Sequence, residues 1–108
     1  MLRVTVLKCA RTDVESIYAW IQQRSPRGAE AWYNTFESAA RKLAKDGTSF
    51  GLAPEADRVG VPLRQTLFRT RNGKRYRLLF VVVEQEVRIL RVRGPGQPPI
   101  ARADVADT

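Results

Sequence analysis

The sequence contains no histidine and only one cysteine. The absence of histidine excludes histidine metal ligands, Ser-His-Asp and Cys-His catalysis, and any histidine general acid or base. Cys9 cannot form an internal disulfide, and its place at the end of an apolar run favours a packing role. We therefore expect neither a metal site nor a small-molecule cofactor.

Long apolar runs are also missing. No stretch approaches the ~18 apolar residues that a membrane-spanning helix needs. The N-terminus lacks the basic region followed by an apolar core that marks a secretory signal. The chain has 108 residues, of which 44% are hydrophobic, so it has room for one compact core. These features predict a single cytoplasmic domain with no membrane contact.

Acidic residues are scarce in one half of the chain. Between Arg58 and Gly94 there are ten basic and two acidic residues, so this segment accounts for the whole net charge of +8. Arginine predominates, and its planar fork suits phosphate and carboxylate groups. The segment therefore predicts an acidic or polyanionic partner, although a solvated basic face is the simpler alternative. The basic residues are Arg58, Arg64, Arg69, Arg71, Lys74, Arg75, Arg77, Arg88, Arg91 and Arg93.

The first half of the chain predicts one strand and two helices. Alternating apolar residues over 2–6 indicate a short strand. Thr12 and Glu15 have the spacing of a capping box, which predicts a helix over about 13–24. Ser25 and Pro26 are typical of a second helix start, and Gly47 is a suitable residue just beyond its end. We expect these helices to form an antiparallel hairpin.

The second half predicts three strands. An irregular connection rich in glycine and proline fills residues 46–62. Strands are then expected over 63–71, 74–84 and 87–93, with a tight turn at Asn72-Gly73 and a loop at Glu84-Gln85-Glu86. Residues 98–108 are expected to be a flexible tail. The predicted class is α+β, with the order β-α-α-β-β-β and a mainly antiparallel, twisted sheet that the N-terminal helical hairpin covers on one face.

The register of the last hairpin decides where the arginines lie. A three-residue loop at Glu84-Gln85-Glu86 would pair Leu79 with Arg91 and Arg77 with Arg93. Arg75, Arg77, Arg91 and Arg93 would then share one face, where their repulsion favours a visiting anion. A two-residue loop would divide them between the two faces. The clustered arrangement could hold either a phosphate or the carboxylates of an acidic peptide.

Aromatic and acidic side chains offer further candidates. Trp32 is expected in the core, whereas Trp20 and Tyr33 lie at the flanks of their helical stripes and are expected to be partly exposed. Tyr76 has a core interpretation and a base-stacking one. Glu55 precedes the basic segment and is a candidate general base, with a plain surface residue as the default.

Four segments together resemble the RelE/ParE family of toxins. Residues 12–21 are similar to the family's first helix, Leu63-Arg64 to the start of its second strand, residues 73–80 to its central strand and residues 87–94 to its last strand. The resemblance covers about residues 2–97, and 1–97 is expected to form the toxin domain. It implies a type II toxin whose partner is a cognate antitoxin with a partly disordered segment.

The resemblance implies two kinds of activity, and the sequence leaves both open. RelE-like members cleave mRNA on the ribosome without a metal, whereas ParE-like members poison DNA gyrase. Arg77 matches the strand arginine that contacts the scissile phosphate in nucleolytic members, and Arg64 and Lys74 lie at basic positions near that site. Arg75, Arg91 and Arg93 are candidate target-binding residues, while antitoxin-binding residues cannot be assigned.

One departure favours the ParE-like activity. Nucleolytic members usually carry an arginine, histidine or tyrosine just after the last strand, and residues 95–100 offer none to protonate the leaving oxygen. We therefore expect a toxin that acts on DNA gyrase or on an unassigned target. A ribosome-dependent mRNA endoribonuclease is the alternative, and a non-toxic nucleic-acid-binding module is a further one.

Overall fold

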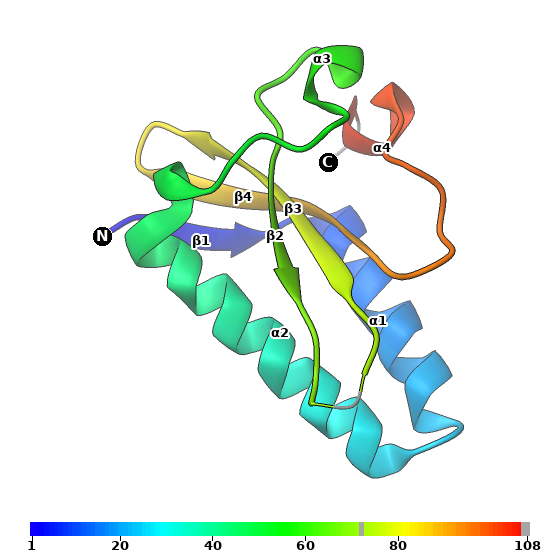
Figure 1. Cartoon of the computed structure of the whole chain (residues 1–108). Coiled ribbons are helices and arrows are strands. Elements are labelled where there is room, and N and C mark those ends of the chain that lie inside the picture. Colours follow the sequence, from blue (N-terminus) through cyan, green and yellow to red (C-terminus); the bar gives the residue numbers. More distant parts are fainter. Residues whose placement is uncertain (72, 107–108) are drawn as a thin grey trace.

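The computed structural model describes residues 1–71 and 73–106, and its element order is shown in Figure 1. The predicted order β-α-α-β-β-β is confirmed, with three short helices in addition. Asn72 of the predicted Asn72-Gly73 turn lies outside the described residues. The elements are β1 (Arg3–Val6), α1 (Lys8–Gln22), α2 (Pro26–Asp46), the 3-10 helix η1 (Gly47–Ser49), α3 (Ala56–Val59), β2 (Arg64–Phe68), β3 (Tyr76–Val83), β4 (Glu86–Arg93) and α4 (Arg102–Ala106).

The two long helices differ in how their ends match the prediction. Ser25 caps α2 as expected, because its Oγ accepts a hydrogen bond from the Gly28 amide at 2.9 Å. The capping box at Thr12 is wrong: α1 begins at Lys8, and the Thr12 hydroxyl donates to the Lys8 carbonyl within the helix. Gly47 keeps a right-handed conformation, and it suits a close approach, since an added Cβ would lie 3.0 Å from the Val87 side chain.

The strands form one open sheet in the order β1-β4-β3-β2, in which only the β1–β4 pair is parallel. The helical hairpin covers one face of this sheet (Figure 1). Trp32 and Phe36 of α2 pack there against Leu78, Phe80 and Ile89. A second, smaller core lies on the other face, where the 46–62 connection and the C-terminal segment pack. Its buried members are Ala53, Ala56, Val59, Leu63, Leu79, Leu90 and Ile100.

The β3–β4 hairpin has a two-residue turn, so the predicted three-residue loop is wrong. Val83 pairs with Glu86, and Glu84 adopts a positive φ of 57° in the turn. A bulge next to Leu79 and Phe80 then shifts the register by one residue. The predicted pairs of Leu79 with Arg91 and of Arg77 with Arg93 are confirmed, because the extra residue of the bulge compensates for the shorter turn.

Within the predicted flexible tail, Ile100 and Val105 pack against the second core, and residues 107–108 lie outside the described residues. Ile100 is 1% exposed and belongs to the second core, and α4 follows it over Arg102–Ala106. The tail's apolar contacts come from Ile100 and the partly buried Val105, two residues in a stretch otherwise made of small, polar and proline residues, which is why composition alone suggested fraying. Within residues 1–71 and 73–106, no helix has the length and apolar character needed to cross a membrane.

Candidate functional site

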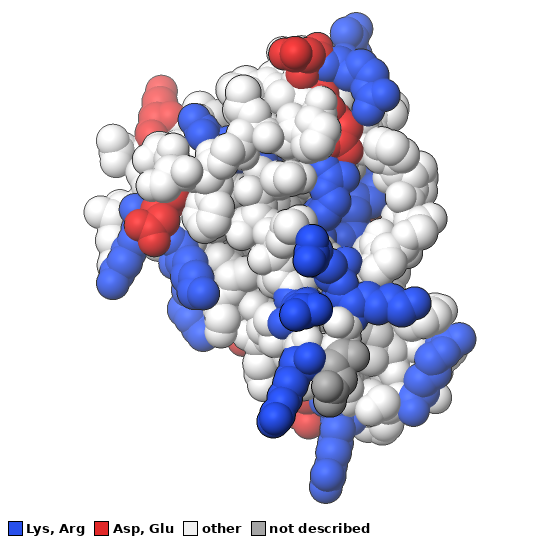
Figure 2. All heavy atoms as spheres, in the orientation of Figure 1, with Lys and Arg blue, Asp and Glu red and all other residues white. Residues whose placement is uncertain are grey.

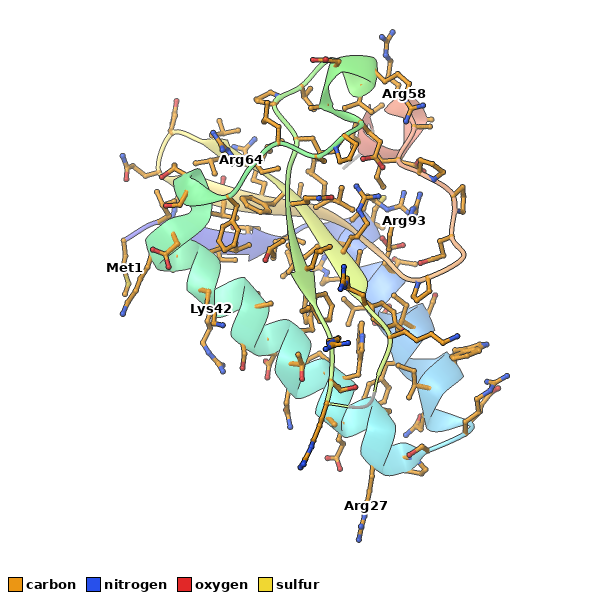
Figure 3. The ribbon with its side chains drawn as sticks, viewed as in Figure 1. Met1, Arg27, Lys42, Arg58, Arg64 and Arg93 are labelled. Carbon is orange, nitrogen blue, oxygen red and sulfur yellow. The ribbon has the colours of Figure 1, made fainter. Side chains whose placement is uncertain are left out.

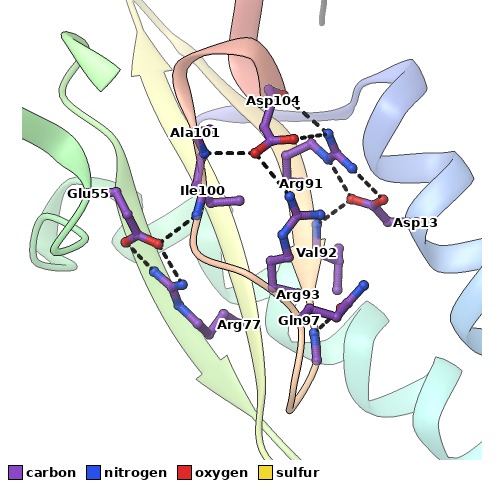
Figure 4. Close-up of polar contacts among 11 residues, drawn as sticks. Asp13, Glu55, Arg77, Arg91, Val92, Arg93, Gln97, Ile100, Ala101 and Asp104 are labelled. Carbon is purple, nitrogen blue, oxygen red and sulfur yellow. Dashed lines mark hydrogen bonds and ion pairs between the residues drawn. The ribbon is translucent and has the colours of Figure 1, made fainter. Parts of the chain in front are cut away.

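Arg77, the residue proposed to contact a scissile phosphate, is engaged inside the protein. Its two terminal nitrogens donate to the two carboxylate oxygens of Glu55 at 2.8 and 2.6 Å (Figure 4). Its Nε donates to Gln65 Oε1 at 3.0 Å. Glu55 is 2% exposed. A bidentate ion pair of this kind fixes both side chains and satisfies the hydrogen-bonding nitrogens of the guanidinium.

Glu55, the candidate general base, lies in the same ion pair. The hydrogen bonds from Arg77 lower its pKa from 4.5 to about 2, against the opposing effect of burial, and the Ile100 amide also donates to it at 3.0 Å. A carboxylate with so low a pKa is a poor proton acceptor near neutral pH. The geometry instead makes Glu55 a link between the 46–62 connection, β3 and the C-terminal segment.

Arg91 and Arg93 are also paired with carboxylates (Figure 4). Arg91 forms two hydrogen bonds to Asp13 of α1, at 2.8 and 2.9 Å, and these raise its pKa above the usual value. Asp104 of α4 lies between the two arginines, 3.2 Å from Arg91 and 3.1 Å from Arg93. The Ala101 amide is the largest cause that lowers the pKa of Asp104.

The expected open cluster of anion-binding arginines is therefore wrong. We call Arg77, Arg91 and Arg93 the latched arginines, because each is held by a carboxylate of the chain itself. They do share the sheet face opposite the helical hairpin, as the register predicted. Their partners come from α1, the 46–62 connection and α4, so pattern reasoning within the strands could not find them.

The remaining predicted site residues divide into two kinds. Arg64 is half-buried and donates from Nη1 to the Phe50 carbonyl, so it braces the connection that follows η1 (Figure 3). Lys74 and Arg75 are exposed at the end of the β2–β3 hairpin. Arg69 and Arg71, which the sequence did not mark as site residues, lie at the same end. All four are exposed, and among the described residues none of them forms an ion pair. We call this set the hairpin-end cluster: Arg69, Arg71, Lys74 and Arg75.

Figure 2 shows basic side chains gathered over the part of this face that carries the β2–β3 hairpin, with few acidic ones between them. A groove of about 890 Å³ lies beside the hairpin end, between it and the α1–α2 turn. We call it the hairpin groove. Trp20 lines it and is 56% exposed, in agreement with the prediction of partial exposure. The Arg24 guanidinium stacks on the Trp20 ring at 3.9 Å.

A second groove, of about 650 Å³, lies along β1 and α2. We call it the edge groove. β1 is an outer strand of the sheet, and its Val4 and Val6 line the groove together with Phe36 and Ala40 of α2. An outer strand beside an apolar groove can accept an added strand or a peptide.

An open α+β sheet covered by an N-terminal helical hairpin is the arrangement of the RelE/ParE-like toxins. The chain matches the profile of the ParE toxin of the type II toxin–antitoxin system parDE over residues 4–97. It belongs to that family, which implies a cognate antitoxin as partner. No curated protein matches the chain.

Proposed function

We propose that this protein is a toxin that acts by binding DNA gyrase and not by cutting mRNA. The observation that carries the proposal is the state of Arg77, which lies at the position that contacts the scissile phosphate in nucleolytic relatives. Glu55 and Gln65 occupy its guanidinium. A phosphate could displace Glu55 only by leaving a buried carboxylate without its partner, which costs several kcal/mol.

The surroundings of Arg77 support the same conclusion. In-line attack on a phosphodiester needs a group that takes a proton and another that returns one to the leaving oxygen. Glu55 is held ionised by its low pKa of about 2, and residues 95–100 supply no titratable side chain. The chain belongs to the ParE toxin family, and gyrase is the target that the resemblance to ParE-like members implies. The toxin would then act in the cytoplasm, and residues 1–97 would form its toxin domain.

Two assays in parallel test the proposal. The full chain is expected to stabilise cleaved DNA when added to DNA gyrase and supercoiled plasmid, and to leave mRNA intact in primer-extension analysis of cells that express it. The variant Leu43→Asp, which places a charge in the helix-facing core, serves as an unfolded control. Codon-phased mRNA cuts without gyrase cleavage complexes would overturn the proposal.

We also propose the edge groove as the docking site of the antitoxin. The groove is mostly aliphatic, and the outer strand β1 can both donate and accept backbone hydrogen bonds with an added strand. Arg41 and Lys45 at the rim of the groove suit an acidic segment. Arg41→Glu with Lys45→Glu, at exposed positions on the rim, is expected to weaken co-purification of the antitoxin. Lys8→Glu with Arg11→Glu, which reverses the same charge at exposed positions outside the groove, is not. Unchanged capture by the rim variant would exclude this surface.

A further inference from the structure

The hairpin-end cluster is a concentration of unpaired positive charge. Residues 58–83 contain no acidic residue, and the four cations lie within the seven residues 69–75. Arg27, at the start of α2, points outward at the same end of the molecule (Figure 3). Unlike the latched arginines, these side chains are exposed and free of internal carboxylates in the described chain. Exposed cations gathered in this way form a surface that suits a polyanion.

The hairpin groove beside the cluster is lined by aromatic rings. Trp20, Trp32 and Tyr76 line it, together with Lys74 of the cluster. The volume of about 890 Å³ is within the range of sites for small organic ligands. Trp20 is the exposed ring among them, and an exposed aromatic face next to cations is what proteins use to hold unstacked bases, since every base has a planar face to stack.

Trp32, one of the residues that line this groove, has an unpaired hydrogen-bond donor in the described chain. Trp32 is 2% exposed, and its indole Nε1 has no partner among the described residues. A buried donor without an acceptor carries a free-energy cost. A base, which presents carbonyl and ring-nitrogen acceptors, could satisfy it. A peptide carbonyl or a carboxylate could accept from it as well, so this donor calls for an acceptor and does not by itself select a base.

We infer that the hairpin-end cluster and the hairpin groove together bind single-stranded nucleic acid. The cluster contacts phosphates, and an unpaired base enters the groove and stacks on Trp20, either on the ring face opposite the Arg24 guanidinium or in exchange for it. The edge groove, which is lined mainly by aliphatic side chains, is the better surface for a peptide, so an acidic protein segment is the less suitable occupant here. This binding does not depend on gyrase being the target.

The test uses the full chain and fluorescently labelled oligonucleotides of roughly ten nucleotides, as single-stranded DNA, as RNA and as duplex. Anisotropy is measured from about 50 to 200 mM salt. Four phosphate contacts predict that the logarithm of the binding constant falls with that of the salt concentration with a slope of about −3. Binding of DNA and RNA alike supports recognition through phosphate and base, and a preference for RNA supports it with added contacts to the 2′-hydroxyl.

Matched variants separate the two parts of the site. Arg71→Gln with Lys74→Gln should reduce the steepness of the salt dependence by about 1.4, and Trp20→Ala should weaken single-strand binding roughly tenfold without changing the slope. Arg11→Gln with Lys42→Gln removes the same charge from exposed positions on the helices, outside the groove, and should leave the slope unchanged. All the replaced residues are exposed, so the fold is expected to persist.

Three results would overturn the inference. Equal effects of the two double variants would reduce the binding to general attraction by net charge. Duplex binding as tight as single-strand binding, together with no effect of Trp20→Ala, would remove the base from the groove. Displacement of the oligonucleotide by an equal concentration of polyglutamate would assign the site to acidic peptides. Because gyrase is absent from the assay, its outcome is separate from that of the gyrase experiment.

Discussion

The latched arginines and the hairpin-end cluster carry the same kind of charge in opposite surroundings. Arg77, Arg91 and Arg93 meet Glu55, Asp13 and Asp104, so that region is close to neutral. The hairpin-end cluster has four cations and no such partner among the described residues. The comparison teaches that the count of basic residues along a strand does not locate a binding surface. What matters is whether the fold supplies counter-charges.

The two regions should also respond differently to mutation. In the latched region each arginine joins elements that are distant in the sequence, so its ion pairs support the fold. At the hairpin end the side chains make few internal contacts, so they are available to a partner and contribute little to stability. Replacing a residue in each region therefore tests the comparison directly.

The largest effect is expected from Glu55→Ala. This change removes the Glu55 carboxylate, which accepts hydrogen bonds from the Arg77 guanidinium and the Ile100 amide beside the second core. Removing one member of a buried ion pair costs about 3–5 kcal/mol, which urea denaturation would measure as a lower free energy of unfolding. Glu15→Ala, at an exposed glutamate of α1, is the control and should change this free energy by less than about 0.5 kcal/mol. Similar losses in both variants would show that Glu55 does not hold the fold.

The next largest effect is expected from acid, which should lower the free energy of unfolding through the latched region. The pKa of Glu55 is lowered from 4.5 to about 2 in the folded chain, chiefly by Arg77. Its contribution is therefore present above pH 4.5 and is lost as the pH falls from 4.5 to below 2, by a total of about 3 kcal/mol. The free energy of unfolding of the native chain should fall more steeply over this window than that of Glu55→Gln. Parallel curves would contradict the prediction.

Asp104→Asn is expected to have a smaller effect, confined to the C-terminal segment. Arg93 would lose its carboxylate partner, whereas Arg91 would keep Asp13. We expect a loss of about 1 kcal/mol and faster tryptic cleavage at Arg102, because α4 would detach more often. Deuterium exchange of the Ile100 amide reports the same opening. Cleavage at the native rate would mean that the packing of Ile100 and Val105 anchors the segment without the Asp104 ion pairs.

The fold could be predicted because its signals are local. Alternation over residues 2–6 and the apolar run of β3 indicate strands, and Ser25 and Pro26 mark a helix start. The strand pairing near Arg91 was predicted through an incorrect turn, because a bulge and a shorter loop shift the register by opposite amounts. A pattern of alternating residues can reveal a face but cannot reveal a compensated insertion.

The candidate site was only partly predictable because its electrostatics are not local. Asp13 lies 78 residues from Arg91, and Glu55 lies 22 residues from Arg77. Nothing in the sequence around these carboxylates indicates which arginine they meet. The exposure of Trp20, in contrast, followed from its place at the flank of a helical stripe. Features that depend on one element were predictable, and features that depend on the meeting of several were not.

The smallest stability effect is expected at the hairpin end. Arg71→Gln with Lys74→Gln should change the free energy of unfolding by less than about 0.5 kcal/mol, since both side chains are exposed and unpaired in the described structure. The sign of this change in the free energy of unfolding should depend on the salt concentration. At low ionic strength the variant should be slightly more stable than the native chain, because removing like charges relieves their repulsion, and this gain should disappear as salt screens the cluster.

Thermal melting of both proteins at low and high salt measures this difference, with Arg11→Gln and Lys42→Gln as the control that removes equal charge from the helices. A variant that loses more than about 1 kcal/mol would show that the hairpin end is built into the fold in the same way as the latched arginines. The contrast between the two regions would then fail. The two regions would then differ only in how exposed their side chains are. A cluster whose contacts stabilise the fold is not free to exchange those contacts for contacts with a nucleic acid.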